Sequence, residues 1–340
     1  MKHKEKVEGV SPSEWKKALL NQKRKKERPL VTIAVPTYNR PHFLPRALEC
    51  IAEQTYKPLE VMVVDNATPG TENEEIVNSF KKKIPGITYS KNPENVGYER
   101  NYLHCLEIAK GEFFMHFPDD DEILPAHVEA CVETLLEHPE ASFSSVYVHC
   151  LSSPDICAGI TPPVTYMEED WYKRALAFLL EYFRDEYWGG RMTMHYCVHR
   201  RVPFLRAIKS SMEKFYRSDR FFDSSFFFLE MMIEGKVVPV MRKDCALLFH
   251  AYTEKLWYEK QELSGFLDNQ IEKIRWMRLW MHSYWTYTRR VYMRGGLRYA
   301  IPFGVVAVSI LGHMFVVSLY RQIKLRLEKM FGLTLAKNGG

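Results

Sequence analysis

Two hydrophobic patterns alternate along the first 140 residues. Short runs of β-branched, aliphatic and aromatic residues predict buried strands within 29–37, 59–65, 86–92 and 112–117. Between them, apolar residues three or four positions apart predict a helix within 41–56. A polar helix is predicted around 74–82, and a further helix within 98–111, with Gly111 as its C-cap. Strands that alternate with helices predict an α/β fold with a mostly parallel sheet that is covered on both faces.

The pattern is less regular beyond residue 120. It predicts helices over 124–140 and 170–188, a strand over 142–150, and a strand over 192–204 that returns to the sheet. A final helix and strand are predicted within 218–240. The Pro-rich segment 151–170 predicts a loop or lid.

Polar side chains stand where the predicted strands end. They are Asn39, Asp65, Asn95 and the run Asp119–Asp121. In open sheets of parallel strands, ligands bind in a crevice beyond the carboxyl ends of the strands. The sequence therefore predicts a polar site at this edge of the sheet.

Three consecutive aspartates follow the strand at 112–117. Like charges a few ångströms apart repel each other, which disfavours such a run in a folded chain. A divalent cation removes that cost, because Mg²⁺ and Mn²⁺ prefer carboxylate oxygens. Two structural alternatives remain open: a solvated acidic turn, or an aspartate that caps the next helix.

Charge is distributed unevenly along the 340 residues. The chain has a net charge of +5, with +6 in residues 1–28 and +8 in residues 289–340, which leaves −9 for the residues between them. Basic ends around an acidic body argue against a nucleic-acid-binding protein and favour contact with an anionic membrane surface. A disordered solubilising tail is the alternative for the N-terminal run NQKRKKER.

Cysteine usage and the N-terminus bear on the compartment. The seven cysteines are scattered without a CxxC pair, which favours reduced thiols in the cytosol. The N-terminal residues contain no apolar core of the kind that a signal peptide needs.

Five segments in chain order resemble glycosyltransferase family 2, whose members have the GT-A fold and invert the configuration of the transferred sugar. They read VTIAVPTYNR (31–40), LEVMVVDNAT (59–68), NPENVGYERN (92–101), AKGEFFMHFPDDDEILP (109–125) and FLEMMIEGKV (228–237). The resemblance covers roughly residues 29–250. It implies a site for a nucleotide-sugar.

The resemblance also implies roles for the residues that bind the nucleoside. The loop of Pro36, Thr37, Tyr38 and Asn39 would lie against the base and the ribose. Asp65 would accept a hydrogen bond from a base N–H group, typically that of uracil in this family.

The phosphate side of the implied site contains Asn95, Gly97, Arg100 and the acidic triplet. The triplet corresponds to the family's DxD motif, which holds Mn²⁺ or Mg²⁺ and touches the ribose and diphosphate. Its register is open: counting back from Pro125 makes Asp120 the metal ligand, whereas the direct reading, which we favour, makes Asp119 and Asp121 the ends of the motif.

An inverting transferase needs a general base that takes the proton from the acceptor hydroxyl. The family places an acid about twelve residues before a Gly-Lys turn, which implies Asp223, with Asp219 as the second candidate. Either aspartate could instead be a helix N-cap. His250 is a candidate third metal ligand, or a polar residue at the end of a strand.

The C-terminal third combines aromatic and basic residues. Trp276, Trp280 and Tyr284 recur every four positions among arginines, which is typical of an interfacial helix, although a helix packed on the catalytic domain is the alternative. Residues 299–320 contain no charged side chain, and at about 1.5 Å per residue they would just reach across a bilayer core of about 30 Å. Pro302 and Gly304 favour an embedded or in-plane helix over a single C-terminal span.

We therefore predict a metal-dependent inverting transferase that moves a sugar from a nucleotide-sugar, with a UDP-sugar favoured, to a glycan or polyprenyl-linked glycan. It would work at the cytoplasmic face of the membrane, as a peripheral or monotopic protein, in bacterial surface polysaccharide assembly. The predicted parts are a basic tail (1–28), a GT-A domain (29–255) and a helical membrane-associating region (256–340).

Two other functions were weighed against this prediction. A nucleotidyltransferase would need a Gly-rich basic loop after the first strand, and PTYNRPHF is not one. A catalytically degenerate GT-A domain that binds nucleotide or acts as a membrane scaffold stays possible. Pro118 stands where the family usually has Leu or Gly, and an adjacent acid pair is missing near Asp223.

Overall fold

The structure of the chain is a computed structural model. It describes residues 28–151, 160–182, 194, 196–215, 225–249, 285, 288–289, 291–305 and 308–309. The chain divides into two compact units, residues 1–178 with 185–258 and residues 179–184 with 259–340.

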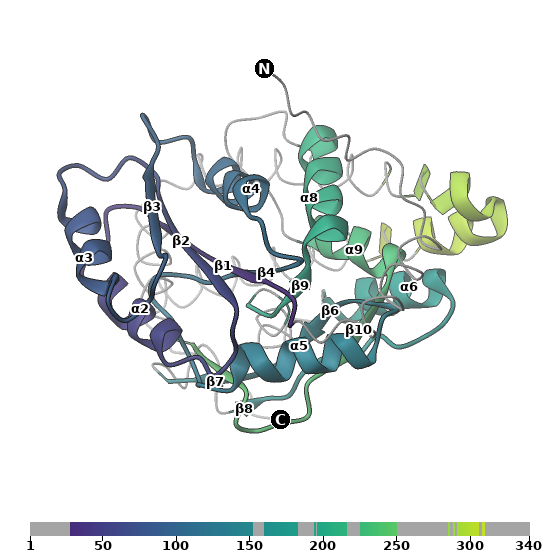
Figure 1. The fold of residues 1–340 in the computed structure, drawn as a ribbon. Coiled ribbons are helices and arrows are strands. Elements are labelled where there is room, and N and C mark those ends of the chain that lie inside the picture. Colours follow the sequence, from purple (N-terminus) through teal and green to yellow (C-terminus); the bar gives the residue numbers. More distant parts are fainter. Residues whose placement is uncertain are drawn as a thin grey trace, which may run out of the picture. The chain divides into compact units, whose positions relative to one another are not determined.

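A seven-stranded sheet forms the centre of the first unit, and its strand order is β10-β6-β9-β4-β1-β2-β3 (Figure 1). The strands are β1 (Val31–Thr37), β2 (Leu59–Asp65), β3 (Thr88–Lys91), β4 (Phe113–His116), β6 (Ala141–Ser145), β9 (His199–Arg200) and β10 (Lys236–Pro239). All neighbours pair in parallel except β9, which runs antiparallel to β4 and β6. The α/β class and the mostly parallel sheet are confirmed.

Helices cover both faces of this sheet. They are α2 (Leu44–Ala52), α3 (Glu72–Phe80), α4 (Tyr98–Ile108), α5 (His127–Glu137), α8 (Arg201–Phe215) and α9 (Ser225–Glu234). Figure 1 shows α4, α8 and α9 on one side, and α2, α3 and α5 on the other. A further helix, α6 (Trp171–Tyr182), follows the loop region.

The strands of the central sheet are buried because both of their faces meet helices. Val31, Ile33, Ala34 and Val35 of β1 are fully buried, and so are all four residues of β4. This explains why these strands read as continuous apolar runs in the sequence rather than as alternating ones.

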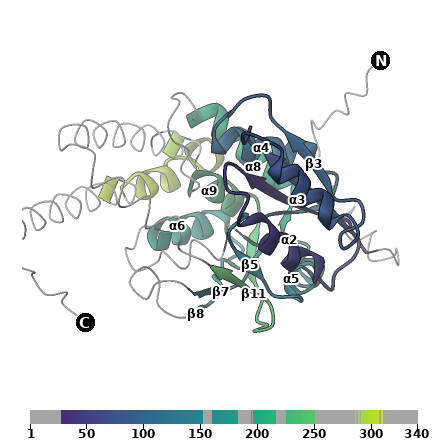
Figure 2. The ribbon, with the colours of Figure 1, turned by 90° about the vertical axis from the view of Figure 1, so that its left-hand side faces the viewer.

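A second, four-stranded sheet has the order β5-β11-β7-β8 (Figure 2). Its strands are β5 (Glu122–Ile123), β7 (Tyr147–Cys150), β8 (Ile160–Thr161) and β11 (Ala246–Phe249). The prediction of a single strand over 142–150 is therefore wrong. The strand is interrupted at the buried Val146, and the residues before and after it belong to different sheets.

Two other sequence predictions need correction. The strand predicted over 192–204 does return to the sheet, but only as β9, because α8 begins at Arg201. Pro203 lies in the first turn of α8, where a missing N–H group is tolerated. Gly111 is not a helix C-cap, since α4 ends at Ile108; a Cβ on Gly111 would lie 2.6 Å from the Thr32 backbone nitrogen, so Gly111 permits a close approach to β1.

In the second unit, residues 291–295 and 297–305 are helical and join at Gly296, whose φ is +78°. Val291, Ala300 and Phe303 are buried, whereas Leu297 and Ile301 are exposed. Within the ranges that the structure describes, no helix has both the length and the apolar character needed to cross a bilayer.

Candidate functional site

The carboxyl ends of four neighbouring strands meet at one edge of the central sheet. Thr37, the last residue of β1, pairs with Asp65, the last residue of β2, and Asp65 pairs in turn with Lys91 of β3. On the other side of β1, β4 runs parallel and Phe117 N donates to Ala34 O at 2.9 Å. The loops that follow these strands therefore converge, as the sequence predicts.

The acidic triplet lies at this edge, between β4 and β5. Asp119, Asp120 and Asp121 are 0%, 6% and 1% exposed, so the alternative of a solvated acidic turn is wrong. The N-cap of α5 is Ala126, so none of the three aspartates caps that helix. The structure thus buries three adjacent carboxylates, and neither a solvated turn nor a helix cap accounts for them.

Asp119 is the most deeply buried member of the triplet. Its Oδ2 accepts a hydrogen bond from Thr37 Oγ1 at 2.6 Å, and its Oδ1 lies 2.6 Å from Nη2 of Arg40. Burial raises the pKa of Asp119 to about 6, against the opposing effects of Arg40 and Thr37. The neighbouring Asp120 carboxylate adds to the rise.

Two arginines contact Asp120 in different ways. Nη1 of Arg40 lies 2.8 Å from Asp120 Oδ2, whereas Arg46, on α2, donates to the Asp120 backbone oxygen at 2.6 Å. Nε of Arg46 also lies 3.4 Å from Glu122 Oε1. Arg40 thus neutralises side chains of the triplet, and Arg46 fixes its backbone.

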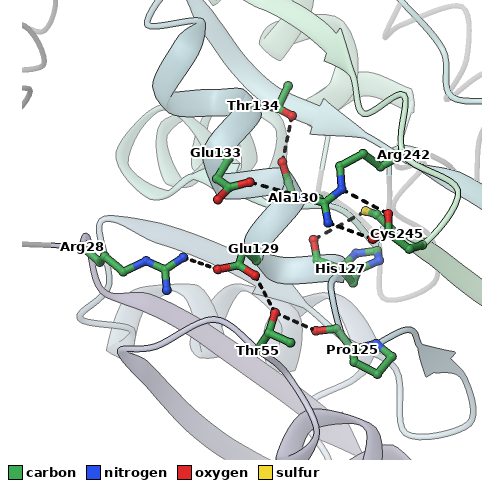
Figure 3. Close-up of polar contacts among 11 residues, drawn as sticks. Arg28, Thr55, Pro125, His127, Glu129, Ala130, Glu133, Thr134, Arg242 and Cys245 are labelled. Atoms are coloured by element: carbon green, nitrogen blue, oxygen red, sulfur yellow. Dashed lines mark hydrogen bonds and ion pairs between the residues drawn. The ribbon is translucent and has the colours of Figure 1, made fainter.

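A second network anchors the segment that follows the triplet (Figure 3). Thr55, between α2 and β2, donates from its backbone N to Pro125 O at 3.0 Å and from its hydroxyl to Glu129 at 2.8 Å. Glu129 also pairs with Arg28. These bonds hold the start of α5 against the loop before β2, and thereby fix where the triplet emerges from the sheet.

Asp65, the last residue of β2, is surrounded by hydrogen-bond donors. Its Oδ1 accepts from Thr68 N at 2.8 Å, and its Oδ2 accepts from Asn73 Nδ2 at 2.9 Å and Tyr89 OH at 2.7 Å. Burial alone would raise the pKa of Asp65, but the hydrogen bonds outweigh it and hold that pKa below its usual value. With the Thr68 hydroxyl as a fourth donor, these bonds use about all four acceptor positions of the carboxylate and fix its orientation.

Four asparagines form a hydrogen-bond network beside Asp65. Asn66 donates to Asn95 Oδ1 at 2.8 Å and accepts from Asn92 at 3.1 Å, while Asn92 also donates to Asn101 Oδ1 at 2.8 Å. The network ties the loop after β2 to the loop before α4. Sequence reasoning singled out Asn95 alone; the other three were visible only as part of the motifs.

The other residues that the sequence predicts to bind a nucleotide lie at the same edge of the sheet. Asn39 has φ +54° and donates its backbone N–H to Thr68 Oγ1 at 2.8 Å, while Tyr38 is 44% exposed. Gly97, with φ +85°, immediately precedes α4, and Arg100 is exposed in the first turn of that helix. Pro36 is half-buried near the end of β1.

Three predicted residues cannot be placed: Asp219, Asp223 and His250 lie outside the described residues. The helix α9 begins at Ser225, two residues after Asp223. The general base and the third metal ligand therefore stay predictions.

A divalent cation fits the triplet only with ligands from elsewhere. In the described ranges, no three His, Cys, Asp or Glu side chains gather as a metal site by themselves. However, Asp119 and Asp120 already face one cationic group, the guanidinium of Arg40, at 2.6 and 2.8 Å. Two carboxylates together with diphosphate oxygens and water form a donor set that suits Mg²⁺ or Mn²⁺.

The site belongs to a region with recognisable relatives. The family described as Glycosyl transferase family 2 matches residues 32–192. A Campylobacter jejuni protein named GalNAc(5)-diNAcBac-PP-undecaprenol beta-1,3-glucosyltransferase is 30% identical over 124 residues, which are 36% of this chain and 38% of the relative. The abequosyltransferase RfbV of Salmonella typhimurium is 34% identical over 98 residues, 28% of this chain and 29% of the relative.

Among solved structures, S. aureus TarS in complex with UDP matches with a TM-score of 0.46 at 15% identity, covering 86% of this chain and 91% of that one. The chain spans well under two thirds of the length of the two curated relatives named above. The shared region contains the strands and loops that build the polar edge.

Proposed function

We propose that this chain transfers a sugar from a nucleotide-sugar to a glycan or lipid-linked glycan acceptor, because residues 32–192 match the family described as Glycosyl transferase family 2. The observation that supports this most directly is the edge of the central sheet. It combines a prebuilt hydrogen-bond acceptor at Asp65 with a buried acidic triplet that a cationic side chain neutralises.

In this proposal the two halves of the edge bind the two halves of the donor. Asp65 accepts an imide N–H of the base in exchange for one of its present donors, which favours a UDP-sugar. The loop of Tyr38 and Asn39 contacts the ribose, and the exposed Arg100 at the start of α4 faces the phosphates. The positive end of the α4 helix dipole supports phosphate binding there.

The triplet serves the leaving group. A divalent metal, when bound, acts as a Lewis acid that stabilises the growing charge of the nucleoside diphosphate. Asp119 and Asp121 are the favoured carboxylates that would hold it, with Asp120 as the alternative and His250 as a candidate third ligand. Of the three aspartates, Arg40 contacts Asp119 and Asp120. The hydrogen bond from Thr37 orients the Asp119 carboxylate before the donor arrives, and the bond from Arg46 holds the backbone of Asp120.

Inversion requires a base on the acceptor side, and Asp223 is the proposed base, with Asp219 as the second candidate. A base at this point would take the proton of the acceptor hydroxyl as its oxygen attacks the anomeric carbon.

The acceptor is proposed to be a polyprenyl-linked glycan of bacterial surface polysaccharide assembly, in keeping with the printed name of the Campylobacter relative. The proposed place of action is the cytoplasmic face of the membrane, and the second unit supports contact with a bilayer. This unit contains an apolar groove of about 750 Å³, and the side chains that line it include Trp285, Tyr292, Leu297, Ile301 and Val308.

The positive charge of this surface favours a membrane with anionic lipids. Arg289, Arg294 and Arg298 are exposed in the same unit, and no Asp or Glu occurs from residue 273 to residue 327. An exposed apolar and aromatic surface with only cationic neighbours suits the interface of an anionic bilayer. We therefore propose that the second unit lies in that interface as a peripheral or monotopic anchor.

The donor half of the proposal is tested by thermal unfolding of the full chain with UDP, GDP, CDP or dTDP, each with and without Mn²⁺. We expect one nucleotide to stabilise the fold, and to do so more with Mn²⁺. Asp120→Ala and Asp121→Ala should remove the Mn²⁺-dependent part, whereas the exposed Asp244→Ala should keep it. No shift with any nucleotide would contradict the donor site.

Release of nucleoside diphosphate separates an enzyme from a degenerate domain. A nucleotide-sugar of the base found above is incubated with the protein and lipid-linked acceptors, and free diphosphate is measured. Turnover that Asp223→Asn abolishes supports the transferase. Nucleotide binding without any turnover would instead support the degenerate, nucleotide-binding alternative.

The membrane half is tested by sedimentation with vesicles of phosphatidylcholine, with and without phosphatidylglycerol. We expect binding to the anionic vesicles, weakened at least about fivefold by the double variant Leu297→Ser/Ile301→Ser, since each buried aliphatic side chain contributes about 1.5–3 kcal/mol. Ile160→Ser is the matched control, because Ile160 is equally exposed at 61% but lies on the first unit. Equal binding of all three proteins would contradict the anchor.

A further inference from the structure

Arg40 occupies the place that a bound metal would need. It follows β1 in the loop of the site, and its two terminal nitrogens reach two different carboxylates, Asp119 at 2.6 Å and Asp120 at 2.8 Å. Nη1 donates a hydrogen bond to Asp120 Oδ2, whereas the contact of Nη2 with Asp119 Oδ1 is an ion pair without hydrogen-bond geometry. In the described part of the chain it therefore acts as the counterion of the triplet.

A metal and this guanidinium cannot both sit against the same carboxylates. The two cations would repel each other, and they would compete for the same oxygen atoms. A diphosphate offers Arg40 an alternative partner, because guanidinium groups bind phosphate with paired, charge-assisted hydrogen bonds. A donor could therefore draw Arg40 away and free the carboxylates.

The two arginines of the site differ in their capacity to move. The Arg40 side chain is 33% exposed and extends from a loop, next to Asn39 with its positive φ. Arg46 lies on α2 and holds the Asp120 backbone oxygen, so it fixes the peptide rather than the carboxylates. Exchange of Arg40 between partners thus leaves the backbone of the triplet in place.

We infer that Arg40 is an exchangeable counterion, which pairs with Asp119 and Asp120 in the free protein and moves to the donor diphosphate when a divalent metal takes the carboxylates. This inference rests on the proposed function of the site. It makes Arg40 a positioning residue that couples donor binding to metal binding. The free protein would then bind metal weakly, and the nucleotide would strengthen metal binding beyond what direct metal–phosphate contact provides.

The size of the coupling can be stated as a fold-change. Couplings between two ligand sites typically change affinity about 5–150-fold, and the change is reciprocal. For a partly exposed pair we expect the lower part of this range. Arg40→Gln should therefore bind Mn²⁺ alone about tenfold more tightly than the wild-type chain, and its nucleotide-induced gain in Mn²⁺ affinity should shrink by about the same factor.

The experiment is a titration of the full chain with Mn²⁺, in which the signal of free Mn²⁺ is followed by electron paramagnetic resonance. It is run without nucleotide and with the diphosphate that stabilises the fold. Arg46→Gln is the matched control, since it removes an equal charge from the same site without freeing the two carboxylates. Arg40→Lys is the second variant, because a point charge cannot bridge both acceptors.

The expected order of Mn²⁺ affinity without nucleotide is Arg40→Gln first, Arg40→Lys next, and Arg46→Gln within about threefold of wild type. Wild-type affinity that equals that of Arg40→Gln would overturn the inference, and so would an equal gain in Arg46→Gln, which would indicate a general effect of charge. If Arg40→Gln does not fold, Arg40→Lys alone decides by the same comparison. Wild-type protein that binds no Mn²⁺ even with nucleotide would instead contradict metal use in the proposed function.

Discussion

The hydrogen bond from Tyr89 to Asp65 should contribute measurably to the stability of the unliganded protein. Tyr89 OH lies 2.7 Å from Asp65 Oδ2, and the Asp65 side chain is almost fully buried. Tyr89→Phe removes this donor and keeps the ring. A hydrogen bond to a charged group contributes about 1.5–3 kcal/mol, and because Tyr89 is half-buried we expect about 1.5 kcal/mol. For a domain of this size, that loss lowers Tm by roughly 3–6 °C.

The loss should depend on pH in a defined direction. Burial raises the pKa of Asp65, but the hydrogen bonds from Asn73, Thr68 and Tyr89 together lower it by more than burial raises it. The folded-state pKa therefore lies below the usual value. Such a group contributes stability that is present above the unfolded pKa of about 3.9 and is lost as pH falls through the folded pKa. The difference between wild type and Tyr89→Phe should therefore be full at pH 7 and shrink in acid.

Urea unfolding followed by circular dichroism at pH 7, 5, 4 and 3 measures both effects. Tyr147→Phe is the matched control, because Tyr147 is also a half-buried strand tyrosine but lies on β7 in the second sheet. The reasoning is refuted if Tyr89→Phe costs less than about 0.5 kcal/mol at pH 7, a value typical of a neutral surface substitution. A difference that stays constant down to pH 3 would refute the role of the Asp65 charge.

Three further variants test other parts of the edge by the same unfolding assay. Thr37→Val should cost about 1.5–3 kcal/mol, because it removes the 2.6 Å hydrogen bond to the buried Asp119 carboxylate; a loss below about 0.5 kcal/mol would contradict this. Asn66→Ala should cost about 2 kcal/mol and weaken nucleotide binding, since it leaves Asn92 and Asn95 without their shared partner; unchanged nucleotide affinity would show that the asparagine network does not shape the site. Gly235→Ala should cost about 1–3 kcal/mol, because its Cβ would lie 2.1 Å from the Ser142 hydroxyl and 3.0 Å from the Ser142 backbone nitrogen, and wild-type stability would mean that β6 shifts freely.

The central sheet and its polar edge could be predicted from the sequence because both leave a local signal. β1, β2 and β4 are buried on both faces, so each is an unbroken apolar run, and the polar residue that ends the run marks the strand end. The second sheet left no such signal. β5 and β8 have two residues each, which is too short for any periodicity, and β11 pairs with β5 and β7 from far along the chain.

The contacts of the site could be predicted less well than its residues. Arg40 was visible as the last letter of a motif, but only the folded loop brings it to Asp119 and Asp120 across about 80 positions of sequence. The asparagine network has the same origin, since Asn66 can bind Asn92 and Asn95 only when the loop after β2 meets the loop that precedes α4. The spacing of residues within a motif does not encode such contacts between loops.

Two independent costs of folding fall on the same edge of the sheet. One is the burial of three carboxylates, which raises the pKa of Asp119 and demands a counterion. The other is backbone strain: in the described ranges the non-glycine residues with positive φ are Asn39 at +54° and Ala67 at +68°, directly after β1 and β2. Strain of this kind costs of order 1–3 kcal/mol per residue and persists where the surroundings impose it. Sequences are otherwise locally consistent with their folds, so the coincidence of unfavourable charge and unfavourable backbone at one edge indicates that this edge was kept for a ligand rather than for stability.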